Sequence, residues 1–503
     1  MITPHNAPKS PPKASTPLLN GGAAAPPYAP TTYAVYPSPY AQKRVGQGQS
    51  AVRRMCLAIL AAVGLWFLAS ALLGSGNIFG GSRFNSDRTD DYPLPPDVDL
   101  EDCVGWGDTE KSSPAVGYPY SAQVSLDVSL PSETETLLFL SKGALSAGNL
   151  KITTSSELTD ARVDITAHYH TTAVRDAAKV CFITRKEGES GVGIFTPAHW
   201  WSRKRTDRLY FDVELLLPRG SASSSPLYIN GLTTDVNNFS HDLDNLKDII
   251  DFGNIFLGGS NGKIHAKALG AATATLQTSN GGVSVEHLVA LKAGVQTSNG
   301  LVSIDYLVAQ NAAVRSSNAR IHGNYHVSDS LSLITSNGAI QASVNINGSE
   351  TSNSLIMHTT NSHIDAVVDL DTTSGTGGIF LVKAETSNGR LTTRIASAPL
   401  DAVLTLNART SNTQASVELP ATYEGSLALS TSSTASAAIR RVDSHEQDPA
   451  CAPHADCKGR TRAVETHVVR KGGVEGAVYW EKKNARRGSV TLQSSNGAVT
   501  IYV

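Results

Sequence analysis

The sequence predicts an all-β protein whose distal half is a β-solenoid, a stack of coils of about 19 residues each. Two observations lead to this fold class. Asparagine recurs every 19 residues from Asn261 to Asn337, in Ser-Asn-Gly at four of these five positions and in Ser-Asn-Ala at Asn318, and the residues around it alternate between apolar and polar. Charged residues are only 17% of the chain. A fixed period near twenty with strand alternation is typical of solenoids. The corner asparagines are Asn261, Asn280, Asn299, Asn318, Asn337, Asn361, Asn388, Asn412 and Asn496.

Each coil is expected to hold two short strands that meet at the Asn-Gly corner. An aliphatic residue stands three residues after the asparagine and another stands four residues before it, as Val283 and Leu276 do around Asn280. Stacking at about 4.8 Å would align these residues into columns and let the asparagine amides bond from coil to coil. Asn and Gly tolerate positive φ, which we expect to explain their place at the corner.

The amino-terminal residues 1–54 are expected to form a disordered cytosolic tail, because ten of the 23 prolines lie there and no apolar periodicity does. Two PxxP stretches, Pro8 to Pro11 and Pro27 to Pro30, are potential sites for a partner of the SH3 or WW type. A solvated linker is the preferred interpretation of this composition.

Residues 55–73 contain no charge and are long enough for one transmembrane helix, which would make membrane lipid a partner. Basic residues are more frequent before this segment than after it, which predicts a cytosolic amino terminus and an extracellular or luminal carboxyl terminus, with the plasma membrane as the expected location. An uncleaved anchor is preferred over a signal peptide cleaved near Ala69 to Ala71.

The rest of the chain divides by composition into five regions. Residues 74–117 are acidic and are expected to form a flexible stalk. Residues 118–250 alternate like strands without a repeat, and are expected to form a β-sheet or sandwich that caps the first coil. The solenoid follows at 251–439. A polar insertion with two cysteines at 440–480 and closing strands at 481–503 complete the chain.

The repeated Thr-Ser-Asn-Gly with an aliphatic residue three positions later resembles the "putative adhesin" domains, over about residues 255–415 and 490–503. The whole layout, from Pro-rich tail to β-rich distal part, is similar to predicted fungal single-pass surface membrane proteins of uncharacterised function. The resemblance implies adhesion, and it supplies no catalytic residue.

Two carboxylates form the most specific candidate for chemistry. Glu286 and Asp305 each stand six residues after a corner asparagine, so they would be stacked about 5 Å apart. Such a pair could raise one pKa and act on sugars, as in β-helical polysaccharide enzymes. We expect instead a solvated charged face, because Lys267 on the neighbouring coil would pair with Glu286.

The next column of the predicted face contains His287, Tyr306 and Tyr325. These rings could stack on carbohydrate or simply fill a corner, and the corner is the preferred interpretation. Together with Glu286 and Asp305 they are the candidate binding residues of the sequence.

Two further motifs have simpler structural explanations. The stretch Gly258 to Gly262 matches G-x-S-x-G, the turn that exposes a nucleophilic serine. No helix pattern follows it, so a solenoid corner is favoured. Trp200 and Trp201 precede the basic residues 203–205 and could contact a partner, but a loop with one buried Trp is favoured.

The cysteines and sequons suggest covalent modifications. Cys451 and Cys457 flank His454, but a structural zinc site needs four ligands, so a disulfide between the two cysteines is expected and no metal or cofactor is predicted. Cys103 and Cys181 are expected to form a second pair. The two N-x-S/T sequons predict glycosylation at Asn238 and Asn347.

The function expected from the sequence is non-enzymatic binding. A net charge of -2 excludes a general nucleic-acid binder. A long repeated face without a singular polar cluster suits adhesion to a cell-wall glycan or a protein ligand. The alternative is a β-helical carbohydrate-active enzyme that uses Glu286 and Asp305.

Overall fold

The computed structural model describes part of the chain, and all of that part belongs to one compact unit, Arg88–Val503. The predicted tail at 1–54, the predicted transmembrane segment at 55–73 and the first residues of the predicted stalk lie outside the described residues. The described ranges are 92–107, 111–130, 136–186, 188–200, 204, 206–219, 226–348, 352–432, 434–442, 447–451 and 460–503.

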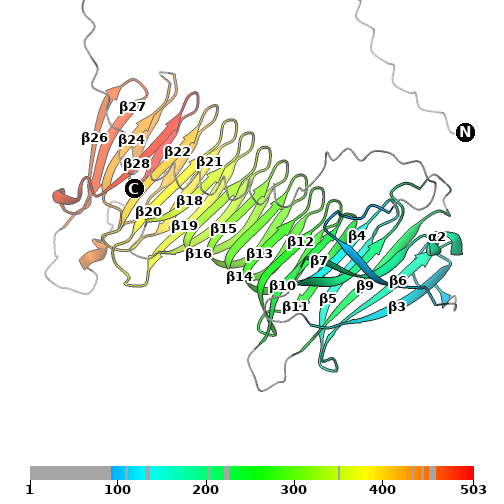
Figure 1. Ribbon diagram of the computed structural model, residues 1–503. Coiled ribbons are helices and arrows are strands. Elements are labelled where there is room, and N and C mark those ends of the chain that lie inside the picture. Colours follow the sequence, from blue (N-terminus) through cyan, green and yellow to red (C-terminus); the bar gives the residue numbers. More distant parts are fainter. Residues whose placement is uncertain are drawn as a thin grey trace, which may run out of the picture. The chain divides into compact units, whose positions relative to one another are not determined.

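The described residues form the predicted all-β solenoid, in which consecutive coils lie side by side (Figure 1). Each coil passes from one sheet to the other at the asparagine corner and returns at a second bend about halfway round. Four long strands run through this bend and belong to both sheets. They are β13 (Ile264–Gln277), β14 (Val283–Thr297), β15 (Val302–Ser316) and β16 (Ile321–Ile334), and they pair in parallel.

The first sheet contains the strand halves that follow the asparagine corner. Its other strands, in spatial order, are β3 (Tyr120–Val128), β6 (Ala161–Tyr169), β9 (Leu209–Pro218), β5 (Gly148–Ser155) and β11 (Phe239–Asn245) before the long strands, and β17 (Ile340–Gly348), β19 (Ile364–Thr372), β21 (Leu391–Ser397), β23 (Ala415–Glu418), β29 (Val499–Tyr502) and β25 (Ala437–Arg440) after them.

The second sheet contains the halves that lead back to the corner. Its other strands are β1 (Asp99–Val104), β7 (Lys179–Lys186), β8 (Glu189–Phe195), β4 (Thr136–Lys142), β10 (Leu227–Val236) and β12 (Ile250–Gly258), then β18 (Ser352–His358), β20 (Ile379–Glu385), β22 (Val403–Thr410), β28 (Gly488–Ser494), β24 (Gly425–Ser430), β27 (Gly473–Tyr479) and β26 (Ala463–Arg470). The short β2 (Lys111–Ser112) pairs with β3.

The core consists of the predicted aliphatic columns between the two sheets. The residues three positions after the corner are at most 1% exposed, and those four positions before it are at most 2% exposed. Burial of each such side chain stabilises the fold by about 1.5–3 kcal/mol, which makes these columns the main source of stability. The first column is Ile264, Val283, Val302, Ile321, Ile340, Ile364 and Leu391, and the second is Leu276, Val295, Val314, Leu333 and Met357.

The corner asparagines stand in one file, and each amide donates to the side-chain oxygen of the preceding one at 2.6–2.9 Å. The file continues after Asn337, where the sequence spacing loosens. Asn496 bonds to Asn412 at 2.9 Å although 84 residues separate them. The file also has a member before Asn261, the first asparagine that the repeat predicts. This member is Asn238, whose side-chain oxygen accepts from the Asn261 amide at 2.6 Å.

Glycine follows the corner asparagines for a different reason from the one expected. None of Gly262, Gly281 and Gly300 is among the residues with positive φ. A Cβ atom on Gly281 would instead lie 1.8 Å from the carbonyl oxygen of Gly262 on the coil before it. Glycine is therefore present because the stacked corners approach closely.

Replacing Asn299 by alanine is expected to lower the free energy of unfolding by about 1 kcal/mol, because the exposed amide donates to Asn280 and accepts from Asn318. Urea unfolding would measure the change. The variant Ser284→Ala alters another exposed side chain of the same stack and is expected to shift stability by less than about 0.5 kcal/mol. Equal stability of Asn299→Ala and wild type would show that the file of asparagines does not stabilise the fold.

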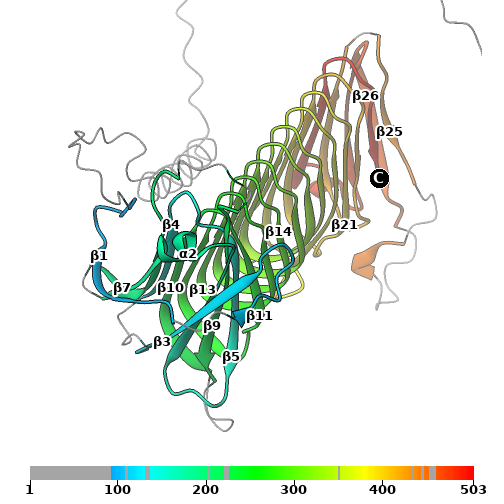
Figure 2. The same cartoon turned by 90° about the vertical axis from the view of Figure 1, so that its right-hand side faces the viewer.

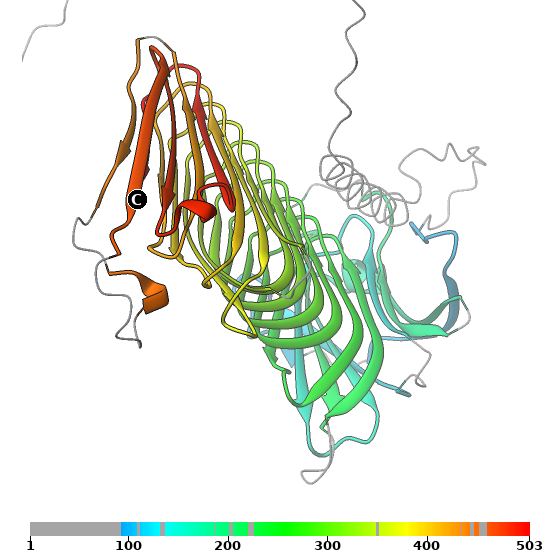
Figure 3. The same cartoon turned by 90° about the vertical axis from the view of Figure 1, so that its left-hand side faces the viewer.

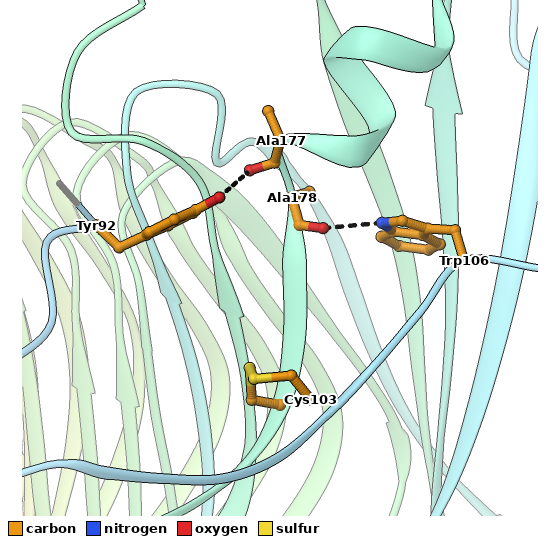
Figure 4. The surroundings of a disulfide bond; sticks show 6 residues. Tyr92, Cys103, Trp106, Ala177 and Ala178 are labelled. Carbon is orange, nitrogen blue, oxygen red and sulfur yellow. Dashed lines mark hydrogen bonds between the residues drawn. A yellow bond between two sulfur atoms is a disulfide. The ribbon is translucent and has the colours of Figure 1, made fainter. Parts of the chain in front are cut away.

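The capping region continues both sheets of the solenoid instead of closing them off. β4, β5, β10 and β11 extend the parallel stack, and antiparallel strands such as β3, β6 and β7 lie at the far end (Figure 2). The part of the predicted stalk around β1 is folded, because β1 pairs with β7 and Cys103 forms a disulfide with Cys181. Beside it, the side chains of Tyr92 and Trp106 donate to the carbonyl oxygens of Ala177 and Ala178 (Figure 4). The helix α2 (Thr172–Asp176) precedes these residues.

The last strands of the chain do not lie at the end of the stack. β28 inserts between β22 and β24, and β29 inserts between β23 and β25. The end is formed by β24, β25 and the hairpin of β26 and β27, which belongs to the predicted insertion (Figure 3). Two short 3-10 helices, Pro449–Cys451 and Lys482–Asn484, flank this hairpin in the sequence.

The predicted localisation, as a single-pass protein of the plasma membrane with an extracellular or luminal carboxyl terminus, is contradicted. In the part of the chain that the structure describes, no helix is long and apolar enough to cross a membrane. The α-helix α2 has five residues, against the roughly 20 that a bilayer requires. The segment 55–73, on which the prediction depended, lies outside the described residues.

Candidate binding groove

A groove of about 860 Å³ follows the second bend of the coils across the strands from β10 to β17. Its lining is mostly apolar, and Leu291 in it is 60% exposed. Exposed apolar surface that continues over several neighbouring coils marks a site of interaction. The apolar floor includes Gly270, Ala272, Val289, Leu291 and Val308.

Aromatic rings line the groove on one side. The ring centroids of His287 and Tyr306 are 4.7 Å apart, and those of Tyr306 and His326 are 4.6 Å apart. Tyr306 and His326 line the groove itself. The rings come from three successive coils, so they form a column along the stack.

Tyr325 was expected in this column and lies elsewhere. The pairing of β15 with β16 shifts by one residue between Ile304 and Leu307, so Tyr325 faces Leu307 inside the core and His326 takes the place beside Tyr306. A second irregularity after Ala309 restores the register. The coil keeps 19 residues and distributes them differently, which the repeat length could not reveal.

Replacing Tyr325 by phenylalanine is expected to raise the free energy of unfolding by about 1 kcal/mol. The ring is fully buried and its hydroxyl has no hydrogen-bond partner among the residues that the structure describes, so the native state leaves a polar group unsatisfied. Thermal or urea unfolding of the two proteins would measure the difference. A less stable Tyr325→Phe protein would mean that the hydroxyl makes a favourable interaction.

The groove contains planar polar groups beside its apolar floor. At one end, Tyr228 is 53% exposed, and Asp248 has a φ of 63°, a strained value for a residue other than glycine. Lys247 pairs with Asp248 at 2.8 Å, which leaves Asp251 as an additional carboxylate in the lining. Amide side chains at Gln310, Asn345 and Asn347 complete the set. The groove therefore offers hydrogen bonds with little net charge.

Glu286 and Asp305 are in register on β14 and β15, as predicted, but neither lines the groove. Both are exposed. Lys267 pairs with Asp244 on the preceding coil at 2.7 Å instead of with Glu286. This hydrogen bond holds the pKa of Asp244 below its usual value and raises the pKa of Lys267. The arrangement is that of a solvated charged face.

The G-x-S-x-G stretch is a corner of the stack. Ser260 follows the end of β12, its amide donates to the carbonyl oxygen of Asn237, and the next element is the strand β13. Trp200 is half-buried against the core, while Trp201 and Arg203 lie outside the described residues.

The predicted covalent sites are only partly described. Cys451 is disulfide-bonded, whereas Cys457 and His454 lie outside the described residues. Among the described residues, no group of His, Cys, Asp and Glu side chains could hold a metal ion. Asn238 is the first member of the asparagine file and also donates to the Ser146 carbonyl oxygen at 3.0 Å. Asn347 is exposed and lines the groove, so glycosylation at both sites stays a prediction.

Sequence reasoning missed a polar cluster near the carboxyl-terminal end, around a cavity of about 260 Å³. Glu424, 8% exposed, accepts from the amides of Trp480 and Glu481 and from the side chains of Asn484 and Arg487. These residues are about sixty positions apart and follow no spacing rule, so no sequence signal could have joined them.

Two family models match parts of the chain. The family described as Toastrack DUF4097 matches residues 212–352, and a domain of unknown function, DUF7330, matches residues 311–445. No curated protein matches the chain at a significant level.

Three solved structures are similar in arrangement, with low scores. A "putative cell adhesion protein" from Clostridium sporogenes ATCC 15579 is 9% identical, with 76% of this chain and 99% of that chain covered and a TM-score of 0.16. A "putative adhesin" from Bacteroides fragilis NCTC 9343 is 16% identical, with 56% and 95% covered and a TM-score of 0.21. Another, from Parabacteroides distasonis ATCC 8503, is 9% identical, with 76% and 97% covered and a TM-score of 0.21.

Proposed function

We propose that this protein is an adhesin-like binding protein that holds an uncharged linear glycan in the groove without cleaving it. The observation that carries the proposal is the combination of aromatic rings, apolar floor and planar polar groups in one groove. Sugar rings have apolar faces that pack on aromatic and aliphatic side chains, and hydroxyls at their edges that bond to carboxylates and amides.

The direction of the groove supports a linear ligand. The groove crosses successive coils, and parallel strands repeat about every 4.8 Å. A polymer lying along the stack could therefore make similar contacts with each coil in turn. The ion pair of Lys247 with Asp248 leaves little net charge, which favours a neutral glycan over an anionic one.

Two exposed leucines allow a matched test. Leu291 lines the groove and is 60% exposed, whereas Leu301 on the neighbouring coil is 50% exposed and does not line it. Isothermal titration calorimetry would measure the affinity of the protein for cello-, laminari- and chito-hexaose. We expect Leu291→Asp to weaken binding at least tenfold for any hexaose that binds wild type, and Leu301→Asp to leave affinity unchanged.

Three outcomes would contradict the proposal. They are the absence of binding to all three hexaoses, an equal loss of affinity in the two leucine variants, and the appearance of shortened sugars after long incubation. The last outcome would restore an enzymatic role.

A further inference from the structure

A serine, a histidine and an aspartate form a hydrogen-bonded series in the capping region, outside the groove. Ser113 Oγ lies 2.8 Å from His168 Nδ1, and His168 Nε2 lies 3.0 Å from Asp212 Oδ2. His168 belongs to β6 and Asp212 to β9, which pair as neighbouring antiparallel strands. Ser113 comes from the segment after β2.

The proton positions follow from the partners. A carboxylate only accepts hydrogen bonds, so His168 Nε2 carries a proton and donates it to Asp212. The other ring nitrogen, Nδ1, then has a free lone pair that accepts from the Ser113 hydroxyl. Nucleophile, base and orienting carboxylate thus occur in the order that acyl transfer requires, with the two ring nitrogens exchanged relative to the usual serine triad.

The surroundings of these three residues hold the histidine in place and leave the serine partly exposed. The imidazole of His168 is 1% exposed, so it is held in place. The rings of Tyr118 and Tyr210 lie 6.3 and 6.4 Å from the ring of His168, and burial raises the pKa of both tyrosines, which keeps them neutral. Ser113 itself is half-buried, so part of this residue faces solvent.

We propose that Ser113 is a nucleophile for short carboxylic esters, with His168 as general base and Asp212 as its positioning residue. Ser113 Oγ attacks the ester carbonyl carbon while its proton passes to His168 Nδ1. The bond to the alkoxide breaks, and the alkoxide leaves with that proton as an alcohol. Water, deprotonated by His168, then hydrolyses the acyl-serine to release the acid and restore Ser113.

One backbone donor fixes the position of the hydroxyl. The amide of Ala115 donates to Ser113 Oγ at 3.1 Å, which holds this oxygen beside the imidazole of His168. The activity is independent of glycan binding in the groove, since no residue is shared.

The test uses a fluorophosphonate, which labels activated serines covalently, and p-nitrophenyl acetate as the ester, both with the full chain. We expect the label on the peptide that contains Ser113, no label on Ser113→Ala, and labelling at least 100-fold slower in His168→Gln and Asp212→Asn. Release of p-nitrophenol should follow the same order.

Neighbouring residues serve as matched controls. Ser112→Ala and His170→Gln replace a serine and a histidine close to Ser113 and His168 in the sequence, and both variants should retain wild-type labelling. Thermal melting of each variant would report its folding. An unlabelled wild type, a label on another serine, or equal labelling of His168→Gln and wild type at equal folded fraction would overturn the proposal and leave the three residues as a structural hydrogen-bond chain.

Discussion

Acidification from pH 7 to pH 4 is expected to lower the free energy of unfolding by about 3 kcal/mol through His241 alone. The imidazole is fully buried in the aliphatic column, between Leu150 and Ile264, and its Nε2 lies 2.7 Å from the Thr234 hydroxyl oxygen. Burial lowers its pKa from 6.5 to about 4.

The direction follows from proton binding. Below pH 6.5 the unfolded chain takes up a proton at His241, and the folded protein does so only near pH 4. Stability from this residue is therefore complete above pH 6.5 and is lost as the pH falls toward 4. Urea midpoints at several pH values would measure the slope.

Two variants separate His241 from the other titrating groups. His241→Leu continues the aliphatic column and should remove most of the slope between pH 6.5 and 4. His322→Gln changes an exposed histidine on the outside of the same stack and should retain it. A wild-type slope that persists in His241→Leu would refute the assignment.

Replacement of Glu424 by alanine is expected to cost about 3 kcal/mol, because it leaves several donors unpaired. The carboxylate accepts from the amides of Trp480 and Glu481 at 2.7 and 3.0 Å, and from the side chains of Asn484 and Arg487 at 2.7 and 3.2 Å. Hydrogen exchange should accelerate most in residues 480–487, next to the end of the stack.

A second glutamate of the same end provides the comparison. Glu465 is exposed and accepts one hydrogen bond, from the Tyr479 hydroxyl at 2.6 Å. Its replacement by alanine should cost less than about 1 kcal/mol. If Glu424→Ala destabilised no more than Glu465→Ala, the carboxylate would not organise this end of the fold.

The repeated part of the fold could be predicted from the sequence because each coil obeys the same local rule. The aliphatic positions around Val283 and Val302 and the file of asparagines follow directly from period and alternation. The fold class is confirmed in these terms. Where the period loosened, as between Asn412 and Asn496, the corners still align, because β28 and β29 return to lie beside β22 and β23 after the chain has formed β24 to β27.

Other features depended on contacts between distant residues. The exchange of Tyr325 and His326 arises from two compensating shifts within a coil of unchanged length. The pairing of Lys267 with Asp244 required knowledge of the coil before the first recognised repeat. The groove itself forms where the second bends of several coils meet, and that bend has no sequence motif.

The measurement that tests the glycan-binding account most directly is hydrogen exchange of the protein with and without a saturating hexaose. The account predicts that slower exchange is confined to the groove segments around residues 247–252, 270–272, 289–291, 308–310, 326–328 and 345–347. Protection at the asparagine corners or in the capping region, with none in these segments, would contradict it.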